Sequence, residues 1–375
     1  MVVNLTKIKC QILFRKVISA FMKGLASFDP SQQSVILWTR YLPALNEVPN
    51  PTILLEVSTD EKLKQTVVSE HLPISEESDH TIRAEIQNLK PNTKYYYRFK
   101  NLETGAVTPI GETRTLPIGA ELSTINLAFT SCANYELGYF NVYKAIADSS
   151  AEFVVHLGDY IYEGYRENHF QGRQHDPPHE IINLDDYRAR YKQYRHDTDL
   201  QNLHQLKPFI CVWDDHEFVN NTYHHPGNDD FTSRREMALQ AWHEYLPCRT
   251  DVKTKIFRTF AFGDIVNLVM LDTRLAGREK QLVYKDYTTA GNVSNRFNDD
   301  WNAPKRSMLG SEQKSWLINQ LSSSNARWQV LGNQVLMGKH YLPKELIPII
   351  VEAQEKGTIS EDKAVQYYKR ICGID

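Results

Sequence analysis

Short runs of mostly apolar residues, separated by turn residues, fill the first third of the chain. The runs are rich in Val, Ile, Thr and Tyr and read SVILWTRYL, TILLEVSTD, TIRAEIQNL and KYYYRFKNL, with Pro, Asn, Gly and Asp between them. The alternation in TIRAEIQNL indicates a strand with one face in water. The segment LKPNTKYYYRF is typical of the tyrosine corner of fibronectin-like and immunoglobulin-like sandwiches. We therefore predict a small β-sandwich over residues 24–117.

Beyond residue 117 the pattern changes to apolar strands that alternate with helical stretches. Strands are expected in INLAFTSC, EFVVHLGD, PFICVWDD and ARWQVLGNQVLMG, and an antiparallel pair in IFRTFAFGDIVNLVMLDTR. Helical spacing occurs in YFNVYKAIAD, DYRARYKQYRHDTDLQNLH, FTSRREMALQAWHEYL and SEQKSWLINQLSSS, and two further helices are expected near the C-terminus in LPKELIPIIVEAQEKG and EDKAVQYYKRICGID. This alternation predicts a layered α/β domain over residues 118–375, with functional loops at the ends of its strands.

The composition narrows the class of protein. A chain of 375 residues is long enough for two domains. It carries 43 Lys and Arg against 46 Asp and Glu, a net charge of -3, so nothing predicts a nucleic-acid-binding patch or a membrane-surface partner. A small anionic substrate would have to be bound by local groups. Five scattered cysteines without CxxC spacing do not indicate a disulfide scaffold, and no run is long enough for a membrane span.

The first 23 residues form an N-terminal extension that is basic and mildly apolar. Lys7, Lys9, Arg15 and Lys16 interrupt any apolar stretch of the length that a cleavable signal needs. We therefore expect a surface amphipathic helix, and the pattern leaves both the compartment and the oligomeric state open.

Polar clusters follow three of the predicted strands in the second domain. They read SCANYE at 131–136, GDYIYE at 158–163 and DDHEFVNN at 214–221. Because the ends of such strands lie close together at the rim of a sheet, these side chains can converge although they are far apart in sequence. The candidates are Cys132, Asp159, Tyr162, Asp214, Asp215, His216, Asn220 and Asn221.

The donor types in these clusters suit two kinds of metal ion. Carboxylate and amide oxygens are preferred by ions such as Ca²⁺, whereas a thiolate and a phenolate favour a stronger Lewis acid such as ferric iron. Asp159 lies between the two sets in chain order and is our candidate bridging ligand. A two-metal site can clamp a phosphate and stabilise its developing charge. His216 is placed to hydrogen-bond the phosphate or to protonate the leaving oxygen.

Each cluster also has a purely structural interpretation. Asp-x-x-Tyr can be an ordinary loop, Cys132 a small buried apolar residue, and Asp-Asp-His-Glu a helix cap. Asp272 and Arg274 can form a core ion pair or belong to the site. The coincidence of all three clusters after apolar strands favours a metal site. Five further histidines are expected in solvated or irregular loops and are not counted as ligands: His169, His175, His179, His224 and His225.

The order of the motifs resembles that of the alkaline phosphatase D (PhoD-like) family of metallophosphoesterases, which is related more distantly to purple acid phosphatases. The resemblance runs through GLASFDPSQQSVILWTR, LKPNTKYYYRF, SCANYELGYF, HLGDYIYE, VWDDHEFVNN, MLDTR and LGSEQKSWL. It implies a fibronectin-like or immunoglobulin-like sandwich followed by a layered α/β/β/α metallophosphoesterase domain. The implied activity is hydrolysis of phosphate monoesters, diesters or both by a metal-activated hydroxide.

The resemblance also implies the metals and their ligands. Fe³⁺ would be held by Cys132 and Tyr162 with Asp159 as the bridge, and Ca²⁺ by Asp215 and Asn221. His216 would face the substrate. Members of this family are often exported.

Two departures from the family pattern stand out. Phe28 occupies a position where the family usually has Gly, and the later Trp-Asp-Gly-Tyr and Gly-Asp-x-His blocks do not occur. The catalytic domain is therefore expected to be truncated at its C-terminus, with reduced or absent activity. The alternative is an inactive remnant that acts as a binding or interaction module. A calcium-stabilised carbohydrate-binding protein would explain the sandwich, but not Cys132 beside Tyr162.

Overall fold

The computed structural model describes most of the chain, namely residues 20–44, 47–48, 50–120, 124–167, 170, 172–224, 229–289, 292–293, 296–337, 343–360, 363–364 and 367. Residues 1–19, which hold most of the expected N-terminal helix, lie outside this part. Contacts divide the chain into a large unit, residues 1–279 with 307–334, and a smaller one, residues 280–306 with 335–375.

The N-terminal region contains a four-stranded antiparallel sheet in the order β4-β3-β6-β7. The phenol of Tyr95 accepts a hydrogen bond from the backbone N–H of Lys90 at 2.8 Å, which is the tyrosine corner that the sequence predicts. Strand β4 was missed because most of its side chains are exposed and only Val68 and Leu72 pack, partly buried, against the core of the sandwich. The strands are β3 (Thr52–Ser58), β4 (Thr66–Pro73), β6 (Lys94–Asn101) and β7 (Gly111–Arg114).

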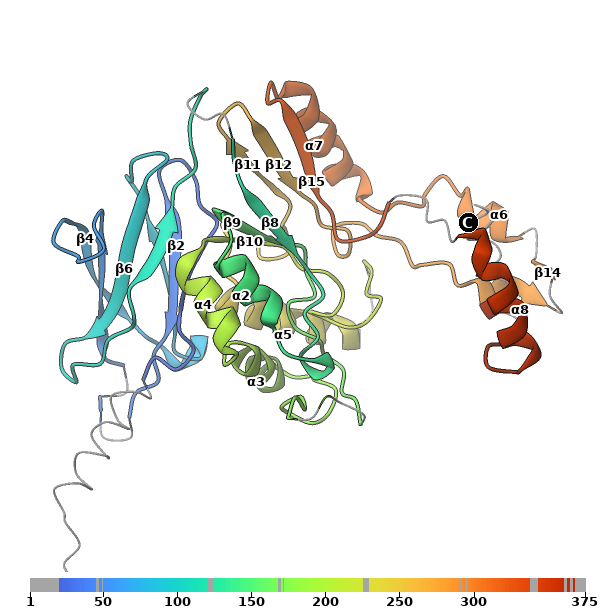
Figure 1. The fold of residues 1–375 in the computed structure, drawn as a ribbon, viewed down its shortest axis with the longest axis horizontal. Helices are drawn as coiled ribbons and strands as arrows, with labels where there is room; N and C mark the ends of the chain where they lie inside the picture. Colours follow the sequence, from blue (N-terminus) through green and yellow to red (C-terminus); the bar gives the residue numbers. More distant parts are fainter. Residues whose placement is uncertain are drawn as a thin grey trace, which may run out of the picture. The chain divides into compact units, whose positions relative to one another are not determined.

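A six-stranded sheet joins the two predicted domains. Its order is β5-β2-β1-β10-β9-β8, antiparallel from β5 to β1 and parallel from β1 to β8 (Figure 1). The link is the pairing of Phe28 with Phe209. Phe28, which stands where the family usually has Gly, is buried at this link and is part of the core. The strands are β1 (Leu25–Phe28), β2 (Val35–Arg40), β5 (Thr81–Ile86), β8 (Leu127–Thr130), β9 (Phe153–His156) and β10 (Phe209–Cys211).

Strands β1 and β2 contribute to two hydrophobic cores at once. One face, with Leu25 and Leu37, packs into the core of the sandwich, and the other, with Phe28 and Trp38, packs into the core of the α/β region. Every residue of both strands is therefore buried. Because these strands belong to both cores, the division of the chain at residue 117 stays a prediction.

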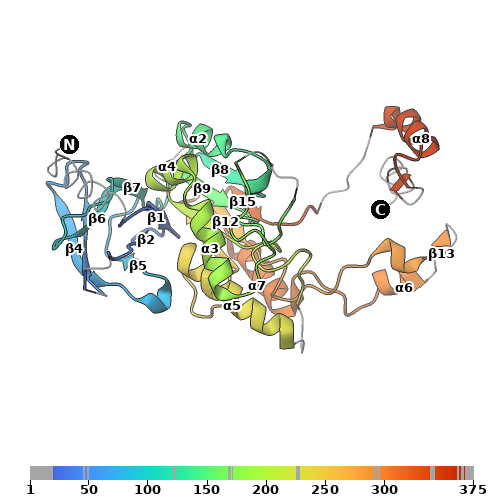
Figure 2. The same cartoon turned by 90° about the horizontal axis from the view of Figure 1, so that it is seen from below.

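The α/β region has helices on both sides of its sheets. Helix α4 packs against β1 and α2, α3 packs against α5, and α7 lies beside the second sheet, of order β11-β12-β15 (Figures 1 and 2). This layered arrangement places the ends of β8, β9 and β10 side by side. The elements are α2 (Asn141–Ala147), α3 (Leu184–Tyr194), α4 (Thr198–Leu206), α5 (Asp229–Tyr245), α7 (Gly310–Ser323), β11 (Arg258–Phe262), β12 (Val266–Met270) and β15 (Trp328–Gly332), with 3-10 turns at η1 (Glu76–Ser78) and η2 (Tyr135–Leu137).

The single helical stretch expected over DYRARYKQYRHDTDLQNLH is two helices. The side chain of Asp197 accepts hydrogen bonds from the backbone N–H groups of Asp199 and Leu200, at 3.1 and 3.2 Å, and so caps α4. The cap starts a new helix just after α3 ends.

The smaller unit contains short elements and one longer helix, α8 (Ile347–Glu355). Helix α8 confirms the helix expected in LPKELIPIIVEAQEKG, and Ile350 packs with Ala364 in a small cluster. Most of the second expected helix lies outside the described residues. The other elements are η3 (Tyr284–Tyr287), β13 (Thr288–Thr289), β14 (Asn292–Val293), α6 (Arg296–Trp301) and η4 (Lys344–Leu346).

Among the described residues, we found no helix with the length and apolar character that crossing a bilayer requires.

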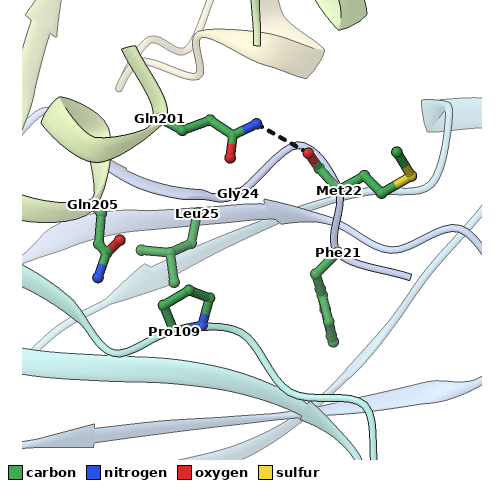
Figure 3. Close-up of a pocket in the computed structure, with 7 residues that line it drawn as sticks. All are labelled: Phe21, Met22, Gly24, Leu25, Pro109, Gln201 and Gln205. Carbon is green, nitrogen blue, oxygen red and sulfur yellow. Dashed lines mark hydrogen bonds between the residues drawn. The ribbon is translucent and has the colours of Figure 1, made fainter. Parts of the chain in front are cut away.

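A cavity of about 320 Å³ lies where the segment before β1 meets α4 (Figure 3). The amide of Gln201 donates to the backbone carbonyl of Met22 at 3.0 Å and helps to fix this junction. The described residues that line the cavity carry no ionisable side chain, so we do not assign it a catalytic role.

Candidate metal centre

The loops that follow β8 and β9 are joined by backbone hydrogen bonds. The N–H of Cys132 donates to the carbonyl of Gly158 at 3.2 Å, and the N–H of Ala133 donates to the carbonyl of Asp159 at 2.9 Å. These bonds bring the SCANYE and GDYIYE clusters together, as the parallel order of the strands requires.

Gly158 allows the loop after β10 to approach equally closely. Its φ is +97°, and a Cβ atom at this position would lie 2.4 Å from the backbone nitrogen of Asp214. Only glycine fits both the backbone conformation and the space. The contact packs the GDYIYE turn against the start of the DDHEFVNN cluster.

Glu217 connects the loop that follows β9 with the loop that follows β10 through hydrogen bonds to their backbone N–H groups. Its carboxylate is fully buried and accepts backbone N–H groups from Asp159 at 3.0 Å, Tyr160 at 2.5 Å and Asp214 at 2.8 Å. Burial and the negative charge of Asp159 raise the pKa of Glu217, while these N–H donors oppose the rise. Glu217 therefore fixes both turns that carry the predicted metal ligands.

Three predicted site residues present donor atoms to one point. Atoms of Asp159, Asp215 and His216 lie within 4.8 Å of one another. Tyr162 belongs to the same group, since its hydroxyl donates to Asp159 Oδ2 at 3.1 Å. The backbone N–H of His216 donates to Asp159 Oδ1 at 3.3 Å. Asp159 is thus in contact with both clusters, the place that a bridging ligand would occupy.

The thiol of Cys132 lies near Asp159 and Tyr162, outside the group of three donor residues, at the loop that follows β8. Partial burial raises its pKa, and the charge of Asp159 adds to the rise. Asp159 and Cys132 also act on the phenol of Tyr162, whose pKa is raised chiefly by burial. Thiol, phenol and carboxylate therefore lie within interaction range, although their residues come from two strands.

Left-handed backbone conformations occur at three of the predicted ligands. The φ values are +60° at Cys132, +53° at Asp159 and +59° at Asn221. Such conformations are costly for residues other than glycine, and they concentrate at functional sites, where the surrounding structure holds them.

Negative charge is crowded around these donors. Burial and the neighbouring carboxylates of Asp214 and Asp215 raise the pKa of Asp159 to about 6. Arg274 offsets part of this charge by pairing with Asp214 and, at 3.2 Å, with Asp215. A cation at the donors would relieve the remaining repulsion. The donor set and its excess of negative charge therefore fit a bound metal ion.

Among the predicted ligands, Asn221 receives the least support from the structure. Its backbone N–H donates to Asp215 Oδ2, while the neighbouring Asn220 donates its backbone N–H to Glu163 Oε1. Both side chains are exposed. The choice of Asn221 as a ligand stays a prediction.

Comparison with known proteins gives the same family across both halves of the chain. Residues 127–367 match the family model of the PhoD-like phosphatase, and residues 12–117 match that of the PhoD-like phosphatase N-terminal domain. Alkaline phosphatase D of Bacillus subtilis (strain 168) is 36% identical over an alignment of 351 residues, which covers 88% of this chain and 58% of that protein.

The chain belongs to the PhoD-like phosphatase family. A solved structure of PhoD aligns with a TM-score of 0.76 and 33% identity over 90% of this chain and 69% of that one. Purple acid phosphatase PPD1 from yellow lupin (Lupinus luteus) seeds aligns with a TM-score of 0.54 and 12% identity over 87% and 52% of the two chains, which shows a shared fold. These matches confirm the predicted fold class. The chain spans 58% of the length of its curated PhoD-like relative.

Sequence reasoning missed the partners that hold the PhoD-like site in place. Glu163 and Glu217 lie inside the quoted clusters, but their carboxylates were not assigned. Asp272 does not pair with Arg274 in a core ion pair: its Oδ1 accepts backbone N–H groups of its own turn, and Arg274 reaches Asp214 and Asp215 instead. The signal for Arg274 was its position four residues past the end of β12, an apolar strand.

One of the histidines set aside has a defined environment in this PhoD-like fold. His175 is buried rather than solvated, and its Nδ1 donates a hydrogen bond to the backbone carbonyl of Gly164 at 2.9 Å. The contact anchors the irregular segment that follows the GDYIYE cluster. It supports the earlier choice not to count His175 as a ligand.

His156, at the end of β9, makes the stability of this fold sensitive to acid. Its Nδ1 accepts the N–H of Gly158 at 3.3 Å, so the neutral ring carries its proton on Nε2, 3.3 Å from the hydroxyl of Tyr143. Burial lowers the pKa of His156 from 6.5 to about 3. Between these values the unfolded chain binds a proton that the folded chain does not, so stability falls as pH falls.

We expect His156 to lower the free energy of unfolding by roughly 1.4 kcal/mol for each pH unit from about pH 6.5 down to about pH 3. Urea unfolding of the parent and His156→Gln at several pH values measures this slope. His71→Gln, on the exposed surface of β4, is the control and should keep the parent's slope. An unchanged slope in His156→Gln would contradict the prediction.

Proposed function

We propose that the chain hydrolyses phosphate monoesters, diesters or both with the help of bound metal ions. The observation that carries this proposal is the convergence of Asp159, Asp215 and His216 within 4.8 Å, with Tyr162 in contact with Asp159. Membership of the PhoD-like phosphatase family supports the same reaction class.

The proposed ligands follow from the donor types. Cys132 and Tyr162, with Asp159, would hold an ion that accepts sulfur and phenolate, such as Fe³⁺; Asp159 would bridge to a second ion, such as Ca²⁺, held by Asp215 and Asn221. When bound, such ions supply Lewis acidity that stabilises charge on phosphoryl oxygens.

The protein's own residues would orient the substrate. His216 lies beside the donors with a partly exposed ring, which stacks on Tyr162 at 4.2 Å between centroids. Although burial lowers it, the carboxylate of Glu163 raises the pKa of His216 to about 9. A cationic imidazole at this place can bind a phosphoryl oxygen and donate a proton to the leaving oxygen.

Removal of the metals provides the test. The purified protein should contain iron and calcium by elemental analysis and should hydrolyse 4-nitrophenyl phosphate or bis(4-nitrophenyl) phosphate. Chelation should lower kcat by more than about 100-fold, and adding back both ions should restore it. The two substrates separate monoesterase from diesterase activity.

Two results would contradict the proposal. Full turnover in a preparation shown to be free of metals would exclude the metal-dependent reaction. A folded protein that neither binds metal nor hydrolyses either substrate would favour the alternative of a binding or interaction module.

A further inference from the structure

Glu163 makes two contacts with the loop that follows β10. Its Oε2 lies 2.6 Å from Nδ1 of His216, and its Oε1 accepts the backbone N–H of Asn220 at 2.5 Å. The carboxylate is buried, with 5% of its side chain exposed. Both of its oxygens are therefore committed to the segment that carries His216.

These contacts determine which nitrogen of His216 is available. Because Nδ1 faces the carboxylate, it carries the proton that the Glu163 hydrogen bond needs, since a carboxylate can only accept. The stacked ring of Tyr162 restricts the imidazole on one of its flat faces. Nε2 is the ring nitrogen left for another partner.

The side chain of His216 lies at an opening in the protein. His216, Tyr162 and Glu163 line a cavity of about 360 Å³, together with Asn134, Tyr165 and Arg166. The cavity adjoins the donor group of Asp159 and Asp215, since His216 belongs to both. A phosphate ester held at the donors can thus extend its leaving group toward His216.

We propose that Glu163 is a positioning residue that holds His216 with Nε2–H directed at the leaving-group oxygen. This inference rests on the proposed phosphoesterase function. The P–O bond to the leaving group breaks with its electron pair on that oxygen, which takes the proton of Nε2. Water supplies the new oxygen on phosphorus and releases a proton to solvent, from which Nε2 is protonated again.

This assignment makes a prediction about substrates that a purely structural role does not. A 4-nitrophenolate leaves readily without a proton, whereas an alkoxide needs one. In Glu163→Gln, kcat/KM for an alkyl phosphate should fall by about 100-fold, and that for 4-nitrophenyl phosphate by less than about 5-fold. The metal content should equal that of the parent.

A matched control is Glu180→Gln, in which an exposed carboxylate loses its ion pair with Arg234. This variant should keep the parent's ratio of the two kcat/KM values. An equal loss on both substrates in Glu163→Gln would overturn the proposal in favour of a structural role. Loss of metal from Glu163→Gln would overturn it in favour of His216 as a metal ligand.

A second measurement does not depend on turnover. In ¹⁵N-labelled, metal-free protein, His216 should show a protonated Nδ1 whose N–H resonance is shifted downfield by the carboxylate. The shift should be lost in Glu163→Gln and retained in Glu180→Gln. An unchanged His216 signal in Glu163→Gln would overturn the positioning role even if the parent protein hydrolysed no ester, a result that would separately contradict the proposed function.

Discussion

Replacing Asp159 with asparagine is expected to lower kcat/KM for 4-nitrophenyl phosphate by at least about 1,000-fold, or roughly 4 kcal/mol of transition-state stabilisation. The amide has nearly the same shape: its oxygen can still accept from the His216 N–H, and its NH₂ group can donate to the Tyr162 hydroxyl oxygen, so both contacts can be kept with the second one reversed. It lacks the charge that a bridging ligand needs. Steady-state kinetics of the variant measures the loss of activity, and elemental analysis measures the loss of metal.

The same variant is expected to be more stable than the parent when both are free of metal. Neighbouring carboxylates and burial raise the pKa of Asp159 to about 6, so above that pH its charge destabilises the folded protein relative to the unfolded chain. At pH 8 the gain should be on the order of 1–3 kcal/mol in urea unfolding. Higher stability of the metal-free variant together with loss of metal binding would show that Asp159 is a metal ligand and not a residue that stabilises the fold.

Asp148→Asn provides the matched control, because this carboxylate is exposed and pairs with Lys144 across one helical turn. It should leave kinetics, metal content and stability within experimental error of the parent. If Asp159→Asn behaved in the same way, the proposed bridge would be wrong.

Glu217→Gln is expected to have the largest effect on stability. One oxygen of the buried carboxylate becomes an NH₂ group that cannot accept, so at least one of the N–H groups of Asp159, Tyr160 and Asp214 loses its partner. We expect the free energy of unfolding to fall by about 3 kcal/mol, with weaker metal binding because both ligand turns loosen.

Urea unfolding and metal titration of Glu217→Gln test this expectation. Glu312→Gln is the control, since its side chain is 76% exposed and pairs with Lys255 on the surface. Its stability should change by less than about 1 kcal/mol. A neutral effect of Glu217→Gln would show that the two turns hold their positions without the carboxylate.

The sequence alone was sufficient for most of the strands, the tyrosine corner and the three polar clusters. Each depends on local chemistry: alternation predicts a strand, the Pro turn before Tyr95 predicts the corner, and acids after apolar runs predict a site at strand ends. The contact between Tyr162 and Asp159 follows in the same way, because three positions within one turn share a side.

The partners of those clusters required the tertiary structure. Arg274 follows β12 in one sheet yet pairs with Asp214 after β10 in the other, and no periodicity in the sequence links two sheets. The sequence assigns no role to Glu163 or Glu217, and only the fold shows that each is buried against N–H groups or a histidine. Burial is a property of the assembled chain.

The sharing of β1 and β2 between two cores was equally invisible in the sequence. An apolar run such as VILWTR indicates a strand that is buried on both faces, but it does not identify the residues that cover each face. The pairing of Phe28 with Phe209 supplies the answer across about 180 positions of chain. Local sequence determined the elements and donor types, whereas long-range pairing, with its effect on burial and charge, determined which of them meet.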